Sequence, residues 1–85
     1  MNLDRELKSI GKAAFEKCYF TIRSYANGRI DTDEALDRMR EESRSMNPPR
    51  RWTPGAMRTR LSKGKAIFLA GLEHEALSRA RSRRL

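Results

Sequence analysis

Residues 58–66 would place small polar and basic side chains on one arc of a helix, a pattern that suits phosphate binding. At about 100° per residue, this arc contains Arg58, Thr59, Ser62, Lys63, Lys65 and Ala66. Lysine and arginine neutralise phosphates, hydroxyl groups donate hydrogen bonds to phosphate oxygens, and small residues permit a close approach. More cations flank the arc, namely Arg50 and Arg51 before it and Arg79, Arg81, Arg83 and Arg84 after it. These cations, together with Thr59 and Ser62, are the candidate nucleic-acid-binding residues.

The net charge of +8 belongs to one part of the chain. Residues 1–49 contain nine Lys and Arg against nine Asp and Glu, whereas residues 50–85 contain ten cations against only Glu73 and Glu75. Such asymmetry is typical of a protein with a polyanionic partner, either nucleic acid or an acidic protein surface. A basic surface that serves only solubility is the alternative.

The residue types that catalysis and metal binding require are scarce. His74 is the only histidine and Cys18 the only cysteine, so no zinc-binding spacing is present. Ser9 and Ser62 lack a positioned base, and the glycines form no phosphate-cradling loop. We therefore expect a protein without enzymatic activity, cofactor or bound metal.

The cysteine content and the hydropathy pattern favour a cytoplasmic protein. A lone Cys18 allows no intramolecular disulfide, which favours a reducing compartment. The first residues form no apolar leader, and no run approaches the ~18 apolar residues of a membrane span. We expect neither secretion nor membrane binding.

The basic arc requires a helix that begins near Trp52. Thr53 can cap the helix N-terminus, and Pro54 fits the first helical position. Trp52 and Met57 have the spacing of a hydrophobic staple, although Trp52 could instead stack on a nucleic-acid base. The face opposite the arc can meet a core and consists of Met57, Leu61, Gly64 and Phe68.

Two helices should precede this basic helix. Apolar residues at intervals of three and four predict one long helix over residues 3–26. They are Leu3, Leu7, Ile10, Ala14, Cys18, Ile22 and Tyr25. Asp31 and Glu34 form a capping box that begins a second helix, which must end before Asn47 and the prolines that follow it. The inward side of this second helix is expected to contain Ala35, Leu36, Met39 and Ser43.

A fourth helix is expected over residues 72–83. Gly71 would terminate the basic helix in a Schellman motif, with Gly64 as the rival position for the break. The sequence thus predicts an all-α fold, with one domain over residues 1–85 and about four helices in two αα-hairpins. Residues 44–52 would form a basic, proline-containing linker and residues 80–85 a basic tail.

The second and third helices, over residues 31–70, resemble the layout of a helix-turn-helix DNA-binding unit, in which the second helix enters the major groove. The linker departs from that motif because it is longer than the usual turn and contains two prolines. The pattern predicts a non-catalytic, nucleic-acid-binding regulatory protein that uses helix 53–70 and the arginine-rich C-terminus. Duplex DNA is preferred over RNA because Trp52 is the only aromatic residue near the basic elements.

A protein-interaction module is the alternative function. Residues 71–77 are similar to the inter-helix turn of a tetratricopeptide repeat, although stable arrays need about three repeats. Such a small adaptor or inhibitor would use its basic face to bind an acidic protein surface. Either function is compatible with a homodimer.

Overall fold

The computed structural model describes residues 1–82, and every regular element in that range is an α-helix. The helices are α1 (Leu3–Ile10), α2 (Lys12–Lys17), α3 (Tyr19–Ala26), α4 (Thr32–Arg44), α5 (Pro54–Leu69) and α6 (Glu73–Arg81). The prediction of an all-α protein is confirmed. No helix within the described residues is long and apolar enough to cross a membrane.

The prediction of one continuous helix over residues 3–26 is wrong, and so is the resulting count of four helices. The segment is divided into α1, α2 and α3 by breaks at Gly11 and Cys18. Gly11 has φ = 92°, which side-chain-bearing residues rarely adopt. An unbroken helix of this length would extend about 36 Å, whereas the longest dimension of the molecule is 30 Å. The breaks let one apolar stripe bend around a compact core.

Helix α4 begins as predicted. The Asp31 side chain accepts a hydrogen bond of 2.8 Å from the Glu34 backbone N–H. The Glu34 carboxylate does not complete the capping box but forms an ion pair with Arg38 at 2.6 Å. The helix ends at Arg44, before the prolines, and all four predicted inward residues are buried.

Both ends of α5 agree with the sequence prediction. The Thr53 hydroxyl accepts a hydrogen bond from the Ala56 N–H at 3.1 Å, and Pro54 occupies the first turn. At the C-terminal end, Gly71 has φ = 74°, and the Leu72 N–H donates to the Ile67 carbonyl at 3.1 Å. This bond is the outer one of a Schellman motif, so the helix breaks at Gly71 and not at Gly64.

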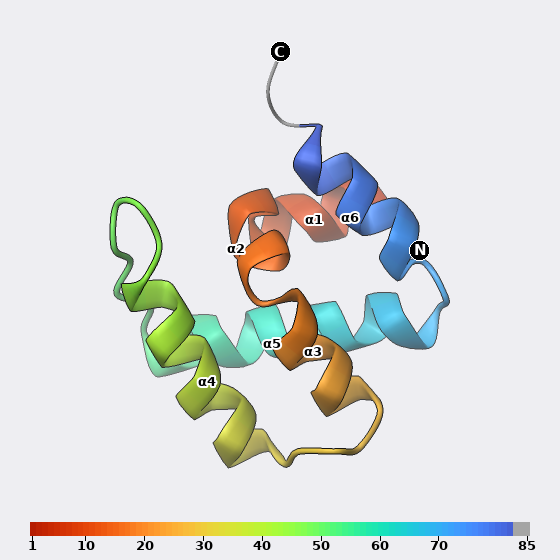
Figure 1. Cartoon of the computed structure of the whole chain (residues 1–85). Coiled ribbons are helices and arrows are strands. Elements are labelled where there is room, and N and C mark those ends of the chain that lie inside the picture. The colour runs from red at the N-terminus through yellow and green to blue at the C-terminus, as the bar shows by residue number, and fades with distance from the viewer. Residues whose placement is uncertain (83–85) are drawn as a thin grey trace.

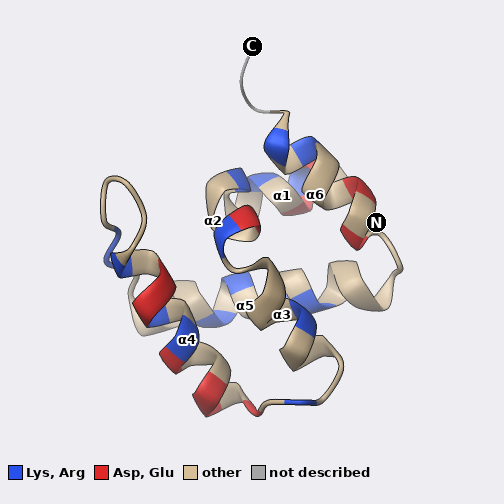
Figure 2. Cartoon of the chain, in the orientation of Figure 1, with Lys and Arg blue, Asp and Glu red and all other residues tan. Residues whose placement is uncertain are grey.

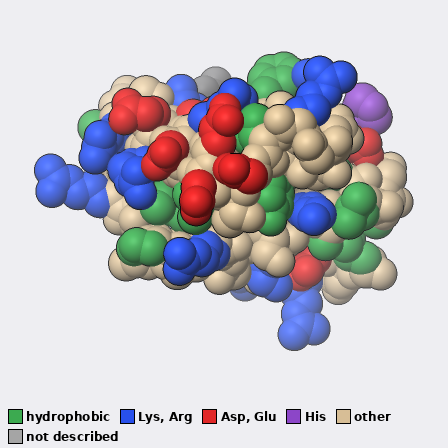
Figure 3. Space-filling view, turned by 90° about the horizontal axis from the view of Figure 1, so that it is seen from below, with side chains coloured by type: hydrophobic (Ala, Val, Ile, Leu, Met, Phe, Trp, Pro, Cys, Tyr) green, Lys and Arg blue, Asp and Glu red, His purple; other side chains and the backbone are tan. Residues whose placement is uncertain are grey.

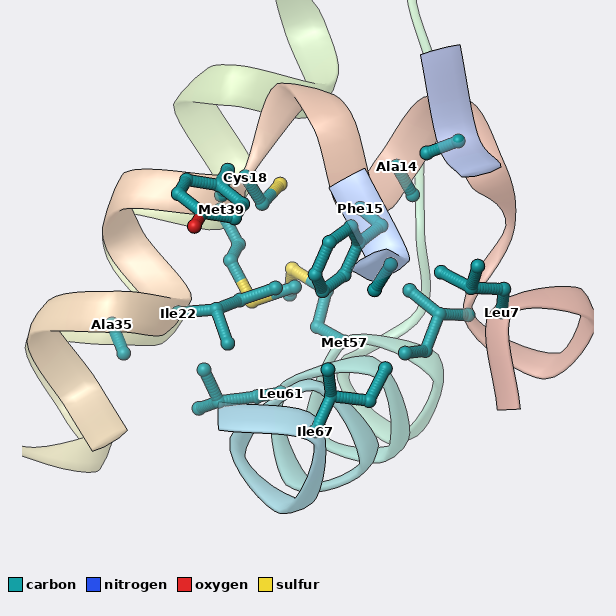
Figure 4. Close-up of a cluster of buried hydrophobic side chains, with 14 of the residues drawn as sticks. Leu7, Ala14, Phe15, Cys18, Ile22, Ala35, Met39, Met57, Leu61 and Ile67 are labelled. Carbon is teal, nitrogen blue, oxygen red and sulfur yellow. The ribbon is translucent and has the colours of Figure 1, made fainter. Parts of the chain in front are cut away.

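The core lies between α5 and the three N-terminal helices. Phe15, at the centre of the close-up in Figure 4, is fully buried among side chains from α1, α3 and α5. Gly64 lets α3 approach α5 closely, because a Cβ atom added there would lie 2.8 Å from Cγ2 of Ile22. The core therefore requires the absence of a side chain at this point of α5.

The remaining helices pack around α5, which passes behind α3 in Figure 1. Helix α4 packs against α3 and α5 on one side, while α6 packs against α1 and α2 on the other. Residues 45–53 connect α4 to the start of α5 and form the loop at the edge of the molecule (Figure 1). Helix α6 buries Ala76 and Ala80.

Candidate nucleic-acid interface

The N-terminal half of α5 and the linker present the predicted basic surface to solvent. Arg58, Thr59 and Ser62 are exposed on one side of α5, and Arg50 and Arg51 are exposed just before it. Within residues 1–82, no ion pair neutralises these three arginines. Their charges are available to an external anion.

The other predicted cations have partners within the protein or lie outside the described residues. Three form ion pairs: Lys63 with Glu6 at 3.6 Å, Arg79 with Asp4 at 2.9 Å and Glu75 at 3.1 Å, and Arg81 with Glu16 at 3.5 Å. The Lys65 ammonium lies 5.0 Å from the centroid of the Tyr25 ring. Arg83 and Arg84 fall beyond the described part of the chain. The predicted C-terminal contribution is therefore partly neutralised by acids of α1 and α2.

Four cations lie near Trp52 in a cleft that we call the basic cleft. Its cationic and aromatic lining residues are Lys8, Lys12, Arg50, Trp52 and Arg60, and its volume is about 600 Å³. Helix α1 contributes Lys8, α2 contributes Lys12, and α5 contributes Arg60. The N-terminal helices and the chain around α5, which are distant in sequence, thus bring positive charge to one concave surface.

Arg60 is held at the base of the cleft by two contacts. Its Nε donates a 2.8 Å hydrogen bond to the Ile10 carbonyl, and its guanidinium lies 4.7 Å from the centroid of the Trp52 ring. Burial lowers the pKa of Arg60, and the nearby positive charge of Arg50 lowers it further. The two arginines therefore repel each other, and a bound anion would relieve that repulsion.

Among residues 1–82, one carboxylate lines the basic cleft. This residue is Asp4, and its side chain forms the ion pair with Arg79. Lys8 and Lys12 are exposed and form no ion pair in the described structure. The cleft consequently has an excess of positive charge with little internal compensation.

A second cleft of about 540 Å³ lies on the other side of the linker and shares Arg50 and Trp52 with the first. Arg51 lines it together with Arg40 and Arg44 of α4. The α4 arginines are engaged at the helix surface, Arg40 with Asp37 at 2.8 Å and Arg44 with Glu41 at 3.3 Å. Arg50 and Trp52 therefore line both clefts, and in the second cleft two of the four arginines, Arg40 and Arg44, are paired.

The charges on α4 differ from those on the linker and the start of α5. Helix α4 carries acidic and basic residues along its whole length, whereas the chain that enters α5 carries basic residues alone (Figure 2). Seen from below, acidic side chains gather into one group with cations around its margin (Figure 3). The face that presents the acids is thus a poor site for a polyanion.

Sequence reasoning missed Lys8, Lys12 and Arg60 as members of the interface. Lys8 and Lys12 belong to the half of the chain whose charges sum to zero, and Arg60 lies at the edge of the apolar stripe of α5. The spacing of four residues between Lys8 and Lys12 is the one feature of the sequence that could have indicated a shared basic face. Their meeting with Arg60 depends on the long-range packing of α1 against α5 and of α2 against α1.

A cluster formed by Thr21, Glu42 and the buried Cys18 lies apart from this basic surface. The Thr21 hydroxyl donates to the Glu42 carboxylate, with distances of 2.9 and 3.0 Å to its two oxygens. Burial raises the pKa of the nearby Cys18 thiol, and the charge and hydrogen bonding of Glu42 raise it further. Cys18 is therefore a protonated core residue and not an activated nucleophile.

Comparison with known proteins leaves the site to be interpreted from its own geometry. The chain matches no protein-family model, no curated protein and no solved structure, so no family is assigned to it.

Proposed function

We propose that this protein binds nucleic acid without catalysing a reaction, and that the basic cleft with the neighbouring Arg51 and Arg58 forms the contact surface. One observation carries the proposal. Lys8, Lys12, Arg50, Arg51 and Arg58 are exposed cations without carboxylate partners among the described residues. A regulatory role would follow from this binding.

The physical reason is that unpaired cations gain more from a phosphate than paired ones do. Lys or Arg that contacts a phosphate releases a condensed counterion from the nucleic acid, and this release drives association. Arg79 and Arg81 would first have to give up Asp4 and Glu16. Their contribution to affinity is therefore smaller than their charge suggests.

Insertion of α5 into the major groove of duplex DNA is the finer form of the proposal. The exposed arc of Arg58, Thr59 and Ser62 supports it because small polar side chains permit a close approach. Helix α4 counts against it, since its exposed acids would approach phosphates; they are Asp33, Glu34, Asp37 and Glu41. The basic cleft supports nucleic-acid binding without requiring this groove geometry.

The test is a titration of labelled nucleic acid at several salt concentrations. We expect log affinity to fall linearly with log salt, with a slope of about −0.9 per duplex phosphate contact or about −0.7 per single-strand contact. Combining Arg51→Gln with Arg58→Gln should reduce the magnitude of the slope by roughly one to two.

Arg38→Gln is the matched control, because it removes an exposed arginine that is paired with Glu34 on α4. This variant should leave the slope nearly unchanged. If neither DNA nor RNA binds at about 50 mM salt, where phosphate contacts are strong, the nucleic-acid proposal is wrong. An acidic protein partner would then be the function to test.

A further inference from the structure

Phe20 of α3 is an exposed aromatic residue whose position the core does not explain. Its side chain is 66% exposed, and the Arg23 guanidinium lies 4.8 Å from its ring centroid. A large aromatic side chain in this apolar segment is expected to widen its packing surface. The structure instead places it at the surface beside the basic cleft.

A third hollow, next to the basic cleft, is lined by Phe20. It has a volume of about 440 Å³, and its walls include Ala13, Lys17, Phe20, Met46 and Arg50. Ala13 and Arg50 also line the basic cleft. The two hollows therefore adjoin each other between α2 and the linker, and we call them together the trough. Arg50 lies in its middle, and the hollows at its two ends are lined by Trp52 and Phe20.

We infer that this trough binds a single strand of nucleic acid, with bases stacked on Trp52 and Phe20 and phosphates held by the cations between them. This inference rests on the proposed function and specifies the form of nucleic acid that the same surface recognises. Single-strand sites combine a basic groove along the backbone with aromatic side chains on which bases stack. The trough contains both parts, cations and two aromatic side chains.

The charges along the trough suit a phosphate backbone. Its cations are Lys8, Lys12, Lys17, Arg50 and Arg60. Its two carboxylates, Asp4 and Glu16, form ion pairs with Arg79 and Arg81 on α6. These two arginines therefore reduce the repulsion that the acids would otherwise exert on a phosphate backbone.

A single strand fits this surface better than a duplex does. The bases of a duplex are stacked inside the helix, so they cannot lie against Trp52 and Phe20 without unpairing. An unpaired strand presents both its phosphates and the faces of its bases. The expectation of duplex DNA rested on Trp52 as the only aromatic residue near the cations, and Phe20 removes that basis.

The experiment compares an oligonucleotide of about ten nucleotides, within the range of known single-strand site sizes, with its own duplex at equal salt. Anisotropy of a labelled strand measures affinity, and fluorescence of Trp52, the only tryptophan, reports stacking. We expect the single strand to bind several-fold more tightly and to quench Trp52. Phe20→Ala should weaken single-strand binding about 5- to 150-fold, as the loss of one stacked base does.

Leu69→Ala is the control, because Leu69 is 69% exposed, similar to Phe20, and does not line the trough. Phe20→Leu keeps apolar bulk at position 20 and should lose affinity as Phe20→Ala does. Tighter duplex binding together with an unchanged affinity of Phe20→Ala would overturn the inference and leave nucleic-acid binding intact. Failure of both oligonucleotides to bind would overturn the inference and the proposed function together.

Discussion

The close approach of α3 to α5 makes Gly64→Ala the most informative test of the fold. The added Cβ would lie 2.8 Å from Cγ2 and 2.9 Å from Cδ1 of Ile22, distances at which atoms must move apart. Ile22 is fully buried, so its side chain has little room to yield. The substitution therefore introduces a clash at the centre of the helix packing.

Two opposing effects determine the size of the change in stability. Overpacking a buried site costs about 1–3 kcal/mol, whereas alanine in place of glycine within a helix contributes about 0.8–1.0 kcal/mol. We expect the clash to prevail and the free energy of unfolding to fall by about 1 kcal/mol. For a domain of this size, that loss lowers the melting temperature by about 4–8 °C.

Thermal and urea unfolding, followed by far-ultraviolet circular dichroism, measure this change, and Gly55→Ala is the matched control. Gly55 also lies in α5, but a Cβ added there meets nothing within 4 Å. Gly55→Ala should be neutral or stabilising. If Gly64→Ala proved as stable as the wild type, the close packing of α3 on α5 would be refuted.

A double-mutant cycle with Ile22→Val tests the same contact from the other side. Ile22→Val removes Cδ1, one of the two atoms that clash with the new Cβ. Alone it should cost about 0.5–1.5 kcal/mol. Combined with Gly64→Ala, it should destabilise the protein by at least about 0.5 kcal/mol less than the sum of the single changes. Strict additivity would contradict a direct contact.

Two further predictions concern the cap of α5 and the buried thiol. Thr53→Ala should lower the free energy of unfolding by about 0.5–2 kcal/mol because the Ala56 N–H loses its acceptor. Thr53→Ser keeps a hydroxyl acceptor and should have nearly the stability of the wild type. Urea unfolding measures both changes. Cys18 has a raised pKa in the folded state, so the unfolded chain alone loses the thiol proton as pH rises above about 9, and stability falls there. Between pH 8 and 10 the free energy of unfolding of the wild type should fall by about 1 kcal/mol more than that of Cys18→Ala. If the free energies of unfolding of the two proteins changed in parallel with pH, a buried, protonated thiol would be contradicted.

Local sequence signals identified three helix ends correctly, at Asp31, Thr53 and Gly71, because those signals act over a few residues. The caps at Asp31 and Thr53 and the stop at Gly71 each depend on hydrogen bonds within one or two turns. The apolar intervals also identified the core faces, since Leu7, Ile22 and their neighbours in the stripe are buried. These features follow from the sequence without knowledge of the tertiary arrangement.

Tertiary structure alone decided where the N-terminal segment bends and which cations remain unpaired. The same apolar spacing suits one straight helix or three short ones, and the need to enclose a compact core selects the breaks at Gly11 and Cys18. Charge counts could not show that Arg79 and Arg81 would pair with acids of α1 and α2. Nor could they show that Lys12 and Arg60 would meet beside Trp52. Such contacts depend on the packing of residues far apart in the chain, which local spacing does not encode.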